Sequence, residues 1–321
     1  MKSLFRLVRL PNLVIVAATQ YALQYAILLP ELGKIGLKPL LPDFQFFLLV
    51  GSTVLIAAGG YVVNDIEDVD IDRLNKPEKK RIVERVYPLS MCWKIYWGIT
   101  ILGFIISLYL AFFVRDFVQL AIYPAAVFLL WAYSKWFKRQ FLIGNVVVAG
   151  FCAFVAWVVL YAQCLSTPLP SMVDYTISPE ELNLQNYAFK VRSIFGGYAV
   201  FAFISTLFRE IIKDIEDVTG DKAQNCRTLP IVLGVKMSRF IALLIGGLFA
   251  TILLILSYLF FISSSKPDYL KLLLLNLTIT LPVFYALFLL INAKEKTDYS
   301  RLSVIAKLIM LSGLIFILIM Y

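Results

Sequence analysis

The chain of 321 residues is 60% hydrophobic and only 16% charged, with a mean hydropathy of +0.82. A soluble domain is closer to roughly 45–50% apolar and about 25% charged, so this composition excludes an ordinary soluble protein and indicates an all-α polytopic membrane protein. The net charge of +9 is spread over short segments between apolar runs, which fits membrane topology better than nucleic-acid binding.

Nine apolar segments, each near the ~20 residues that cross a bilayer, follow one another along the chain. They cover 12–30, 44–63, 91–114, 117–133, 142–164, 191–208, 238–262, 270–292 and 301–320. The first follows three basic residues, as in a signal peptide, but no clean cleavage site comes after it, so we interpret it as a transmembrane helix. Between the fifth and sixth segments, Ser178-Pro179-Glu180-Glu181 is a weak capping pattern that predicts a short surface helix.

The basic residues predict the orientation. With the N-terminus inside, 23 of the 30 lysine and arginine residues lie on the cytoplasmic side, as the positive-inside rule requires. We therefore expect a multi-pass integral membrane protein with its active site facing the cytoplasm; if the cell is prokaryotic, the membrane is the plasma membrane. We expect one domain, 1–321, built from two four-helix repeats (roughly 1–141 and 142–292) and a final helix at 301–320.

The absence of histidine limits the chemistry of the chain. It excludes histidine-based catalytic triads, imidazole general bases and His-ligated metals. The four cysteines have no paired spacing, so they indicate neither a disulfide framework nor a zinc site. Any metal is therefore expected to be a hard cation held by oxygen atoms.

One acidic pattern occurs twice, 149 residues apart. The first acidic motif, Asn64–Asp72, has the sequence NDIEDVDID, and the second, Lys213–Asp221, has the sequence KDIEDVTGD. Each places three aspartates at i, i+3 and i+7, which a helix brings to one face. Each motif follows an even-numbered apolar segment, so we expect both to open cytoplasmic loops and to face a common cavity. The six residues are Asp65, Asp68, Asp72, Asp214, Asp217 and Asp221.

Carboxylates at a membrane edge are costly unless they are paired or bound to metal. A solvated helix end with surface charge is the simpler alternative, but it does not predict the same spacing twice. Mg²⁺ prefers oxygen ligands and usually binds carboxylates together with substrate phosphates. The two motifs therefore predict a Mg²⁺ site that holds a diphosphate and stabilises its departure.

These motifs resemble a known family. Residues 57–72 look like the first signature of the UbiA-type intramembrane prenyltransferases, and residues 213–234 look like the second. The resemblance covers essentially the whole chain and implies a bundle of nine helices with a central cavity capped by cytoplasmic loops. It also implies Mg²⁺-dependent transfer of a prenyl group from a prenyl diphosphate to an acceptor, with an allylic cation shielded by aromatic faces.

The resemblance assigns roles to individual residues. It makes the six aspartates metal ligands and Asn64 the motif asparagine. Glu67 and Glu216 lie on a different face of the helix, and Asp70 has no counterpart in the second motif. For the diphosphate it implicates basic residues, namely Lys135, Lys138, Arg139, Arg209, Lys213 and Arg81. For the acceptor or prenyl group it implicates Arg9, Asn12, Tyr133 and Asn145.

Simpler interpretations of these residues stay open. Positive-inside anchoring explains Lys138, Arg139 and Arg9, a helix cap explains Asn145, and an ion pair with nearby acids explains Arg209 and Lys213. The stretch 75–81 departs from the Arg-Pro-x-x-x-Gly of many relatives, and Lys76 or Arg81 would serve the phosphate instead.

The acceptor is predicted from residues 208–230, which look most like the branch of the family that attaches a geranylgeranyl group to geranylgeranylglyceryl phosphate. The expected partners are geranylgeranyl diphosphate, a lipid acceptor and membrane lipids, with no nucleic acid. An aromatic acceptor of the 4-hydroxybenzoate or quinone-precursor type is the first alternative. An ion-coupled transporter is the alternative of another class, but its carboxylates would lie near the bilayer midplane. A CDP-alcohol phosphotransferase would carry an Asp-Gly-Ala-Arg motif, which is missing here.

Overall fold

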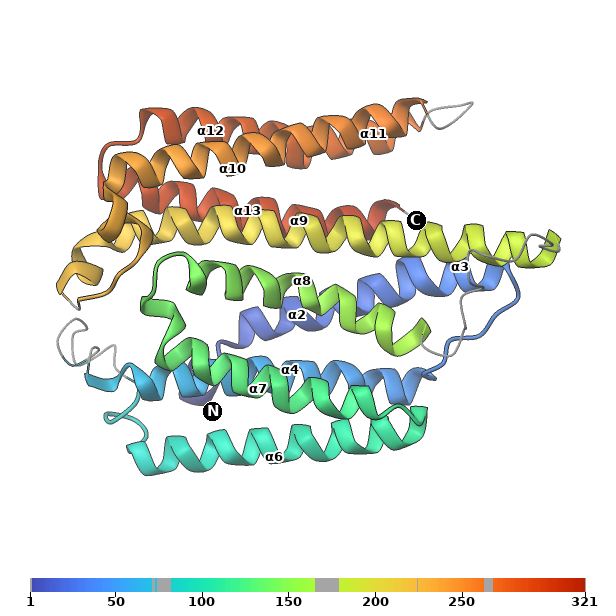
Figure 1. The fold of residues 1–321 in the computed structure, drawn as a ribbon, viewed down its shortest axis with the longest axis horizontal. Coiled ribbons are helices and arrows are strands. Elements are labelled where there is room, and N and C mark those ends of the chain that lie inside the picture. Colours follow the sequence, from blue (N-terminus) through green and yellow to red (C-terminus); the bar gives the residue numbers. More distant parts are fainter. Residues whose placement is uncertain are drawn as a thin grey trace. The chain divides into compact units, whose positions relative to one another are not determined.

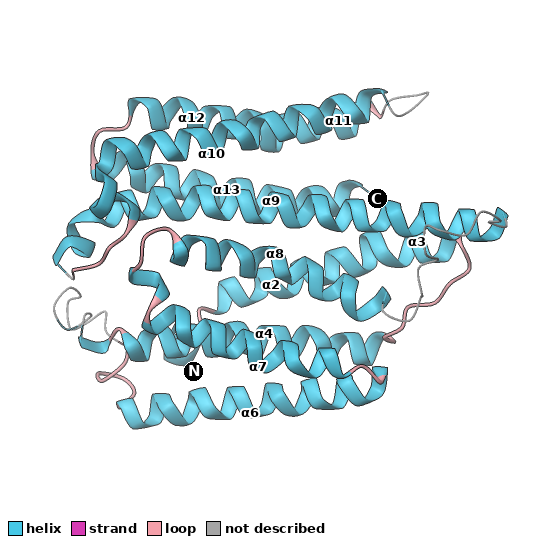
Figure 2. Ribbon diagram, in the orientation of Figure 1, coloured by secondary structure: helices cyan, strands magenta, loops and turns pink. Residues whose placement is uncertain are grey.

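The computed structural model describes residues 2–70, 73, 82–164, 179–223, 225–262 and 268–320. Throughout these ranges the named elements are helices joined by loops (Figure 2), which confirms the predicted all-α class. The elements are α1 (Lys2–Leu7), α2 (Leu10–Ala22), η1 (Leu23–Leu28), α3 (Leu29–Lys34), α4 (Asp43–Glu67), α6 (Leu89–Val114), α7 (Phe117–Lys135), η3 (Phe137–Arg139), α8 (Ile143–Cys164), α9 (Pro179–Ala223), α10 (Leu229–Ile262), α11 (Tyr269–Leu275), η4 (Asn276–Thr280), α12 (Leu281–Asn292) and α13 (Lys296–Met320).

Within the described residues, nine helical stretches are long and apolar enough to cross a membrane, and they match the nine predicted segments in order. Many of their large apolar side chains are exposed; Phe112, Phe117 and Phe128, for example, each expose more than half of their surface. Helices that are hydrophobic on all sides are typical of membrane spans, because lipid and not water surrounds them. The chain is a multi-pass integral membrane protein.

The chain forms two compact units. The first comprises Met1–Lys138 and Val158–Arg192. Within it, α4 packs against α2, α6 and α7 (Figure 1), and the apolar side chains of these helices meet in one core that includes Val62, Ile66 and Tyr96. Because α4 is the central helix of this core, the position of its C-terminal end, where the first acidic motif lies, is fixed by packing on several sides.

The second unit comprises Arg139–Trp157 and Ser193–Tyr321. In this unit α12 packs against both α10 and α13 (Figure 1), and the core contains the fully buried Phe208 and Ile212 of α9. These two residues lie directly before the second acidic motif, so the core of this unit anchors the turn of α9 that leads into it. The two four-helix repeats of the sequence pattern stay a prediction.

Two membrane helices have a π-helical turn directly before a proline. A π-helical turn, η1, directly precedes Leu29-Pro30, and a second one, η4, directly precedes Leu281-Pro282. Proline lacks an N–H group and clashes with the carbonyl group four residues earlier, which would break a regular helix. The wider turn relieves this conflict, so that each span stays helical on both sides of its proline.

Helix α9 is much longer than the predicted apolar segment 191–208. It runs without interruption for 45 residues, which at 1.5 Å per residue is about 68 Å, roughly twice the thickness of the hydrocarbon layer. The short surface helix predicted at Ser178-Pro179-Glu180-Glu181 is wrong as a separate element, because Pro179 is the first residue of α9. Hydropathy located the membrane-embedded part of this helix but could not locate its ends, since no proline interrupts the polar residues on either side.

The same continuity corrects the expected position of the second acidic motif. It does not open a loop, because α9 continues through it to Ala223. All three of its aspartates therefore lie in regular helix, where the spacing i, i+3 and i+7 keeps them on one face. The next helix, α10, also begins earlier than predicted, at Leu229, and is kinked at Gly234, whose φ is 81°.

Gly103 of α6 gives a test of the packing in the first unit. A Cβ atom at this position would lie 2.0 Å from the hydroxyl oxygen of Tyr123, which is buried and donates a hydrogen bond to the carbonyl oxygen of Thr100. We expect Gly103→Ala to lower the free energy of unfolding by about 1–3 kcal/mol, because the helices must separate or Tyr123 must move.

The matched control is Gly98→Ala in the same helix, where a Cβ atom meets nothing within 4 Å. Thermal unfolding of the purified protein in detergent measures both variants. Equal melting temperatures for the two variants would contradict the described packing of α6 against α7.

Candidate active site

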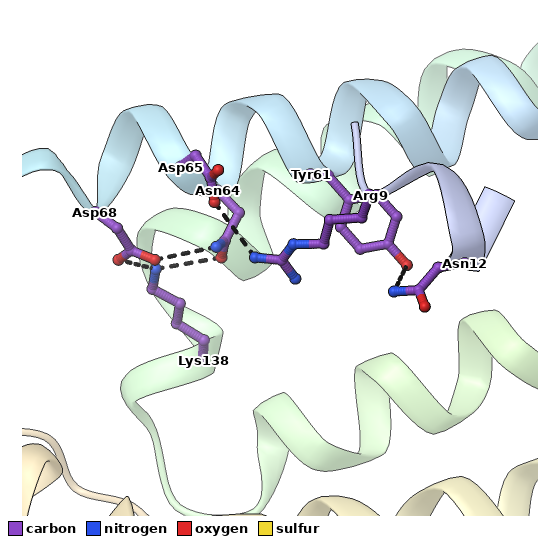
Figure 3. Close-up of polar contacts among 7 residues, drawn as sticks. All are labelled: Arg9, Asn12, Tyr61, Asn64, Asp65, Asp68 and Lys138. Carbon is purple, nitrogen blue, oxygen red and sulfur yellow. Dashed lines mark hydrogen bonds and ion pairs between the residues drawn. The ribbon is translucent and has the colours of Figure 1, made fainter. Parts of the chain in front are cut away.

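The first acidic motif lies at the C-terminal end of α4, where Asp68 follows the last helical residue as its C-cap. The side-chain amide of Asn64, one turn earlier, donates a hydrogen bond of 3.0 Å to Oδ2 of Asp68. Lys138 of η3 makes an ion pair with Oδ1 of Asp68 and donates to Oδ1 of Asn64 at 3.3 Å (Figure 3). Both carboxylate oxygens of Asp68 are therefore held by groups of the chain itself.

This ion pair is largely shielded from solvent, since Lys138 exposes 14% of its side chain and Asp68 exposes 20%. In such surroundings the loss of either partner leaves the other charge poorly compensated, which costs more than the loss of a surface ion pair. The bonds between Asn64, Asp68 and Lys138 fix the position of the Asp68 carboxylate.

Asp65 is paired with Arg9, which lies between α1 and α2. The distance between Arg9 Nη2 and Asp65 Oδ1 is 3.3 Å. The guanidinium carbon of Arg9 also lies 4.8 Å from the ring centroid of Tyr61, and the side-chain amide of Asn12 donates to the hydroxyl group of Tyr61 at 3.2 Å (Figure 3). The structure therefore gathers the predicted residues Arg9 and Asn12 beside the first acidic motif, with Tyr61 between them.

Arg9 adopts a left-handed backbone conformation, with φ at 52°. For a residue with a side chain this conformation costs roughly 1–2 kcal/mol, so the surrounding contacts must hold it in place. The ion pair with Asp65 and the contact with Tyr61 supply this restraint.

The second acidic motif has neutral hydrogen-bond donors. The side-chain amide of Asn145, near the start of α8, donates to Oδ2 of Asp214 at 2.8 Å, and Asn145 is buried. The hydroxyl group of Thr228 donates to Oδ2 of Asp221 at 2.9 Å. Asp217 is half-buried and lies on the same helix between these two aspartates. The predicted Asn145 is thus in direct contact with the motif.

The remaining predicted basic residues have different surroundings. Arg209 forms an ion pair with its neighbour Glu210, Lys213 is exposed, and the carbonyl oxygen of Arg139 accepts a hydrogen bond of 2.8 Å from the backbone N–H of Arg227. These contacts place the Arg139 backbone next to the segment that follows the second motif. The predicted role of all three side chains in binding diphosphate stays a prediction.

Lys135 lies at the end of α7 in an aromatic environment. Its ammonium group is 4.9 Å from the ring centroid of Trp131 and 5.7 Å from that of Trp136, and the residue is exposed. Lysine and tryptophan together are typical of the boundary between membrane and water, so this arrangement fits interfacial anchoring. Tyr133 lies in the same last turns of α7 and is half-buried. Asp72 and Arg81 lie outside the described residues.

Two residues of the site were not among the predicted site residues. Tyr61 lies one helical turn before Asp65, and this spacing of four could have indicated that it shares a face with the motif. Thr228 is a helix-start residue directly before α10, where a threonine usually caps its own helix; here its hydroxyl group binds Asp221 instead. Nothing in the local sequence distinguishes these two uses of the threonine.

Carboxylate oxygens are the main ligand groups of both motifs, and an asparagine side chain lies beside each, Asn64 at the first and Asn145 at the second. Such donors suit a hard divalent cation such as Mg²⁺ and not a soft metal. Among the described residues, no three carboxylate or cysteine side chains are gathered closely enough to hold a metal ion. With Asp72 outside those residues, the metal-binding role of the six aspartates stays a prediction.

Comparison with known proteins shows the class. The model of the UbiA prenyltransferase family matches residues 34–311, so this chain belongs to the UbiA prenyltransferase family and is a prenyltransferase. It is 29% identical to digeranylgeranylglyceryl phosphate synthase of Thermococcus kodakarensis over 282 aligned residues. The aligned region covers 86% of each chain. The predicted family and enzyme class are confirmed.

Solved structures support the same fold. One, on digeranylgeranylglyceryl phosphate synthase in membranes, has a TM-score of 0.63 at 23% identity and covers 99% of this chain and 98% of the other. Another, a UbiA homolog from Archaeoglobus fulgidus bound to DMAPP and Mg²⁺, has a TM-score of 0.53 at 16% identity. The match covers 98% of this chain and 99% of the homolog. At these identities the likeness shows the fold alone, and the predicted UbiA-like bundle is confirmed.

Thr228→Val tests the hydrogen bond to the second motif. Valine has the same shape but no hydroxyl group, so the partly buried Asp221 carboxylate loses a donor. We expect the free energy of unfolding to fall by about 1–3 kcal/mol at neutral pH.

The matched control is Thr251→Val in α10, whose hydroxyl group is exposed and donates only to the carbonyl oxygen of Gly247. Thermal unfolding in detergent compares the two. A Thr228→Val variant as stable as the control would show that this bond contributes little to the fold.

Proposed function

We propose that this protein transfers a geranylgeranyl group from geranylgeranyl diphosphate to the free hydroxyl group of geranylgeranylglyceryl phosphate, forming an ether and releasing diphosphate. The observation that carries this proposal is the similarity to the synthase of Thermococcus kodakarensis, which extends over 86% of both chains. Prenyl transfer itself follows from membership of the family.

We propose Mg²⁺ as the cofactor, held by Asp65, Asp68 and Asp72 of the first motif and by Asp214, Asp217 and Asp221 of the second. The Archaeoglobus homolog bound to DMAPP and Mg²⁺ supports this assignment, as does the hard-donor chemistry of both motifs. A bound Mg²⁺ supplies the positive charge that stabilises a departing diphosphate. No imidazole base is needed for this step, which agrees with a chain that contains no histidine.

The residues of the chain have distinct tasks in this proposal. Asn64 and Asn145 orient aspartate carboxylates through their amide hydrogen bonds. Lys138 supplies an ammonium group beside the first motif, which suits an anionic diphosphate oxygen. Arg9 and Asn12, which contact Tyr61 beside the first motif, would bind the acceptor or the prenyl group.

We also propose the orientation that the basic residues favour. The N-terminus and both acidic motifs face the cytoplasm, and in a prokaryotic cell the protein resides in the plasma membrane. The diphosphate would then be bound and released on the side of the membrane where soluble diphosphates are made and hydrolysed.

The decisive experiment measures diphosphate release by the purified protein with geranylgeranyl diphosphate and Mg²⁺. Geranylgeranylglyceryl phosphate and 4-hydroxybenzoate are offered in parallel, and the products are identified by mass spectrometry. We expect a diether product with the lipid acceptor only. An alkylated aromatic ring would move the protein to an aromatic acceptor, and no release with either acceptor or with other prenyl lengths would overturn the proposed reaction.

Aspartate variants test the metal-site proposal. We expect Asp68→Ala and Asp217→Ala to lose Mg²⁺-dependent turnover by at least a factor of about 1,000, because a metal ligand whose bound ion stabilises the leaving group contributes several kcal/mol. Melting temperature and size-exclusion behaviour would establish that the variants are folded.

The matched control is Asp70→Ala in the same segment. Asp70 exposes 90% of its side chain and pairs with Arg73, so this variant should keep its activity. A folded Asp68→Ala variant with undiminished turnover would contradict the metal-site proposal.

A further inference from the structure

The contacts of Asp68 restrict what can bind to it. Oδ1 is paired with the ammonium group of Lys138, and Oδ2 accepts the amide of Asn64 (Figure 3). A carboxylate has room for further donors, but Lys138 already supplies a full positive charge next to it. A cation that approaches Oδ1 must therefore displace or tolerate this ammonium group.

Asp65 is in a similar situation. Arg9 contacts Oδ1 of Asp65 and is held over the ring of Tyr61. Asp65 thus also has a charged partner from another part of the sequence. Arg9 exposes 44% of its side chain, whereas Lys138 exposes 14%. Because solvent screens the more exposed pair, Lys138 is the stronger competitor for a metal ion.

The free-energy cost of displacing Lys138 from Asp68 depends on whether the metal ion binds alone or together with diphosphate. If a free divalent ion takes its place on Asp68, a largely buried ammonium group loses its carboxylate partner and is repelled by the new charge. If the ion arrives together with a diphosphate, the phosphate oxygens offer the ammonium group a new anionic partner. The same lysine therefore opposes the free ion and favours the ion with its diphosphate.

We infer that the ammonium group of Lys138 occupies the position beside Oδ1 of Asp68 that a metal ion would take. The first acidic motif therefore binds Mg²⁺ as a complex with diphosphate and discriminates against the free ion. This inference rests on the proposed function, and it adds the form in which the metal is bound and the residue that selects it. Lys138 is thus a positioning residue that couples two ligands, beyond a simple contact for the diphosphate.

The coupling between metal binding and diphosphate binding can be measured directly as a change in affinity. The change that diphosphate produces in metal affinity must equal the change that the metal produces in diphosphate affinity. If Lys138 carries this coupling, its removal strengthens binding of the free metal and weakens the effect of diphosphate. A residue with a merely structural role would lower both affinities or neither.

The experiment measures Mn²⁺ binding to the full-length protein in detergent or nanodiscs by electron paramagnetic resonance, with and without inorganic diphosphate. Mn²⁺ serves as the paramagnetic probe for a Mg²⁺ site. The proteins are the wild type, Lys138→Met and Lys138→Gln, so that the comparison still stands if one variant folds poorly.

Lys135→Met is the matched control. It removes the same charge three residues earlier in the chain, but Lys135 lies against Trp131 and Trp136 and not against Asp68. Any general effect of one less positive charge near this end of α7 is therefore common to both methionine variants.

We expect Lys138→Met to bind Mn²⁺ about tenfold more tightly than the wild type without diphosphate, and Lys135→Met to stay within about threefold, because a charge-assisted bond is lost only at Lys138. Diphosphate should tighten Mn²⁺ binding at least tenfold more in the wild type than in Lys138→Met.

Equal or weaker Mn²⁺ binding by both Lys138 variants would overturn this inference and leave the proposed function intact, provided that the wild type binds Mn²⁺ with diphosphate. Failure of every protein to bind Mn²⁺ even with diphosphate would overturn the proposed metal site and the inference together.

Discussion

Charge compensation at the ends of membrane helices is the constraint on which the rest of this structure depends. An uncompensated carboxylate near the hydrocarbon layer is costly. Asp65, Asp68 and Asp214 each have a partner from a distant part of the sequence, and Asp221 has one seven residues further on. The partners differ between the motifs although the spacing of the aspartates is the same. Asp65 and Asp68 have cationic partners, Arg9 and Lys138, whereas Asp214 and Asp221 have neutral donors. The repeated pattern is symmetric in sequence but not in electrostatics.

This difference has a consequence for how the motifs attract ions. A carboxylate paired with an ammonium or guanidinium group has its charge balanced by that partner, whereas an amide or a hydroxyl donor supplies no counter-charge. Asn145 and Thr228 thus orient their aspartates without supplying a counter-charge. The two motifs therefore differ in the charge of the groups that hold their aspartates.

The sequence was sufficient for the number, order and class of the helices, because hydropathy measures contact with lipid directly. It failed where helix geometry is decided by other forces. The true length of α9 depends on polar residues that continue the helix beyond the membrane, and the start of α10 precedes its apolar segment by nine residues. The segments η1 and η4 could not be foreseen, since a proline in a helical pattern predicts a break as readily as a wider turn.

For the candidate site, the sequence identified the aspartates from their spacing, but it could not identify their partners. Lys138 and Asp68 are 70 residues apart, and no local pattern connects them. Lys135 and Lys138 lie near the same helix end and have the same charge, yet one lies against tryptophan rings and the other against a carboxylate. Only packing separates these two lysines. Arg9 and Asn12 were identified through family resemblance, and their contacts with Tyr61 now give a physical reason for their position.

The π-helical turns before Pro30 and Pro282 also affect how this chain compares with its relatives. One such turn holds about one residue more than a turn of α-helix, so it rotates everything beyond it by about 100° around the helix axis. A relative without the proline can lack that residue and still present the same faces to its neighbours. Single-residue gaps at these two places in an alignment would therefore record a change of helix type and leave the positions of the acidic motifs unaltered.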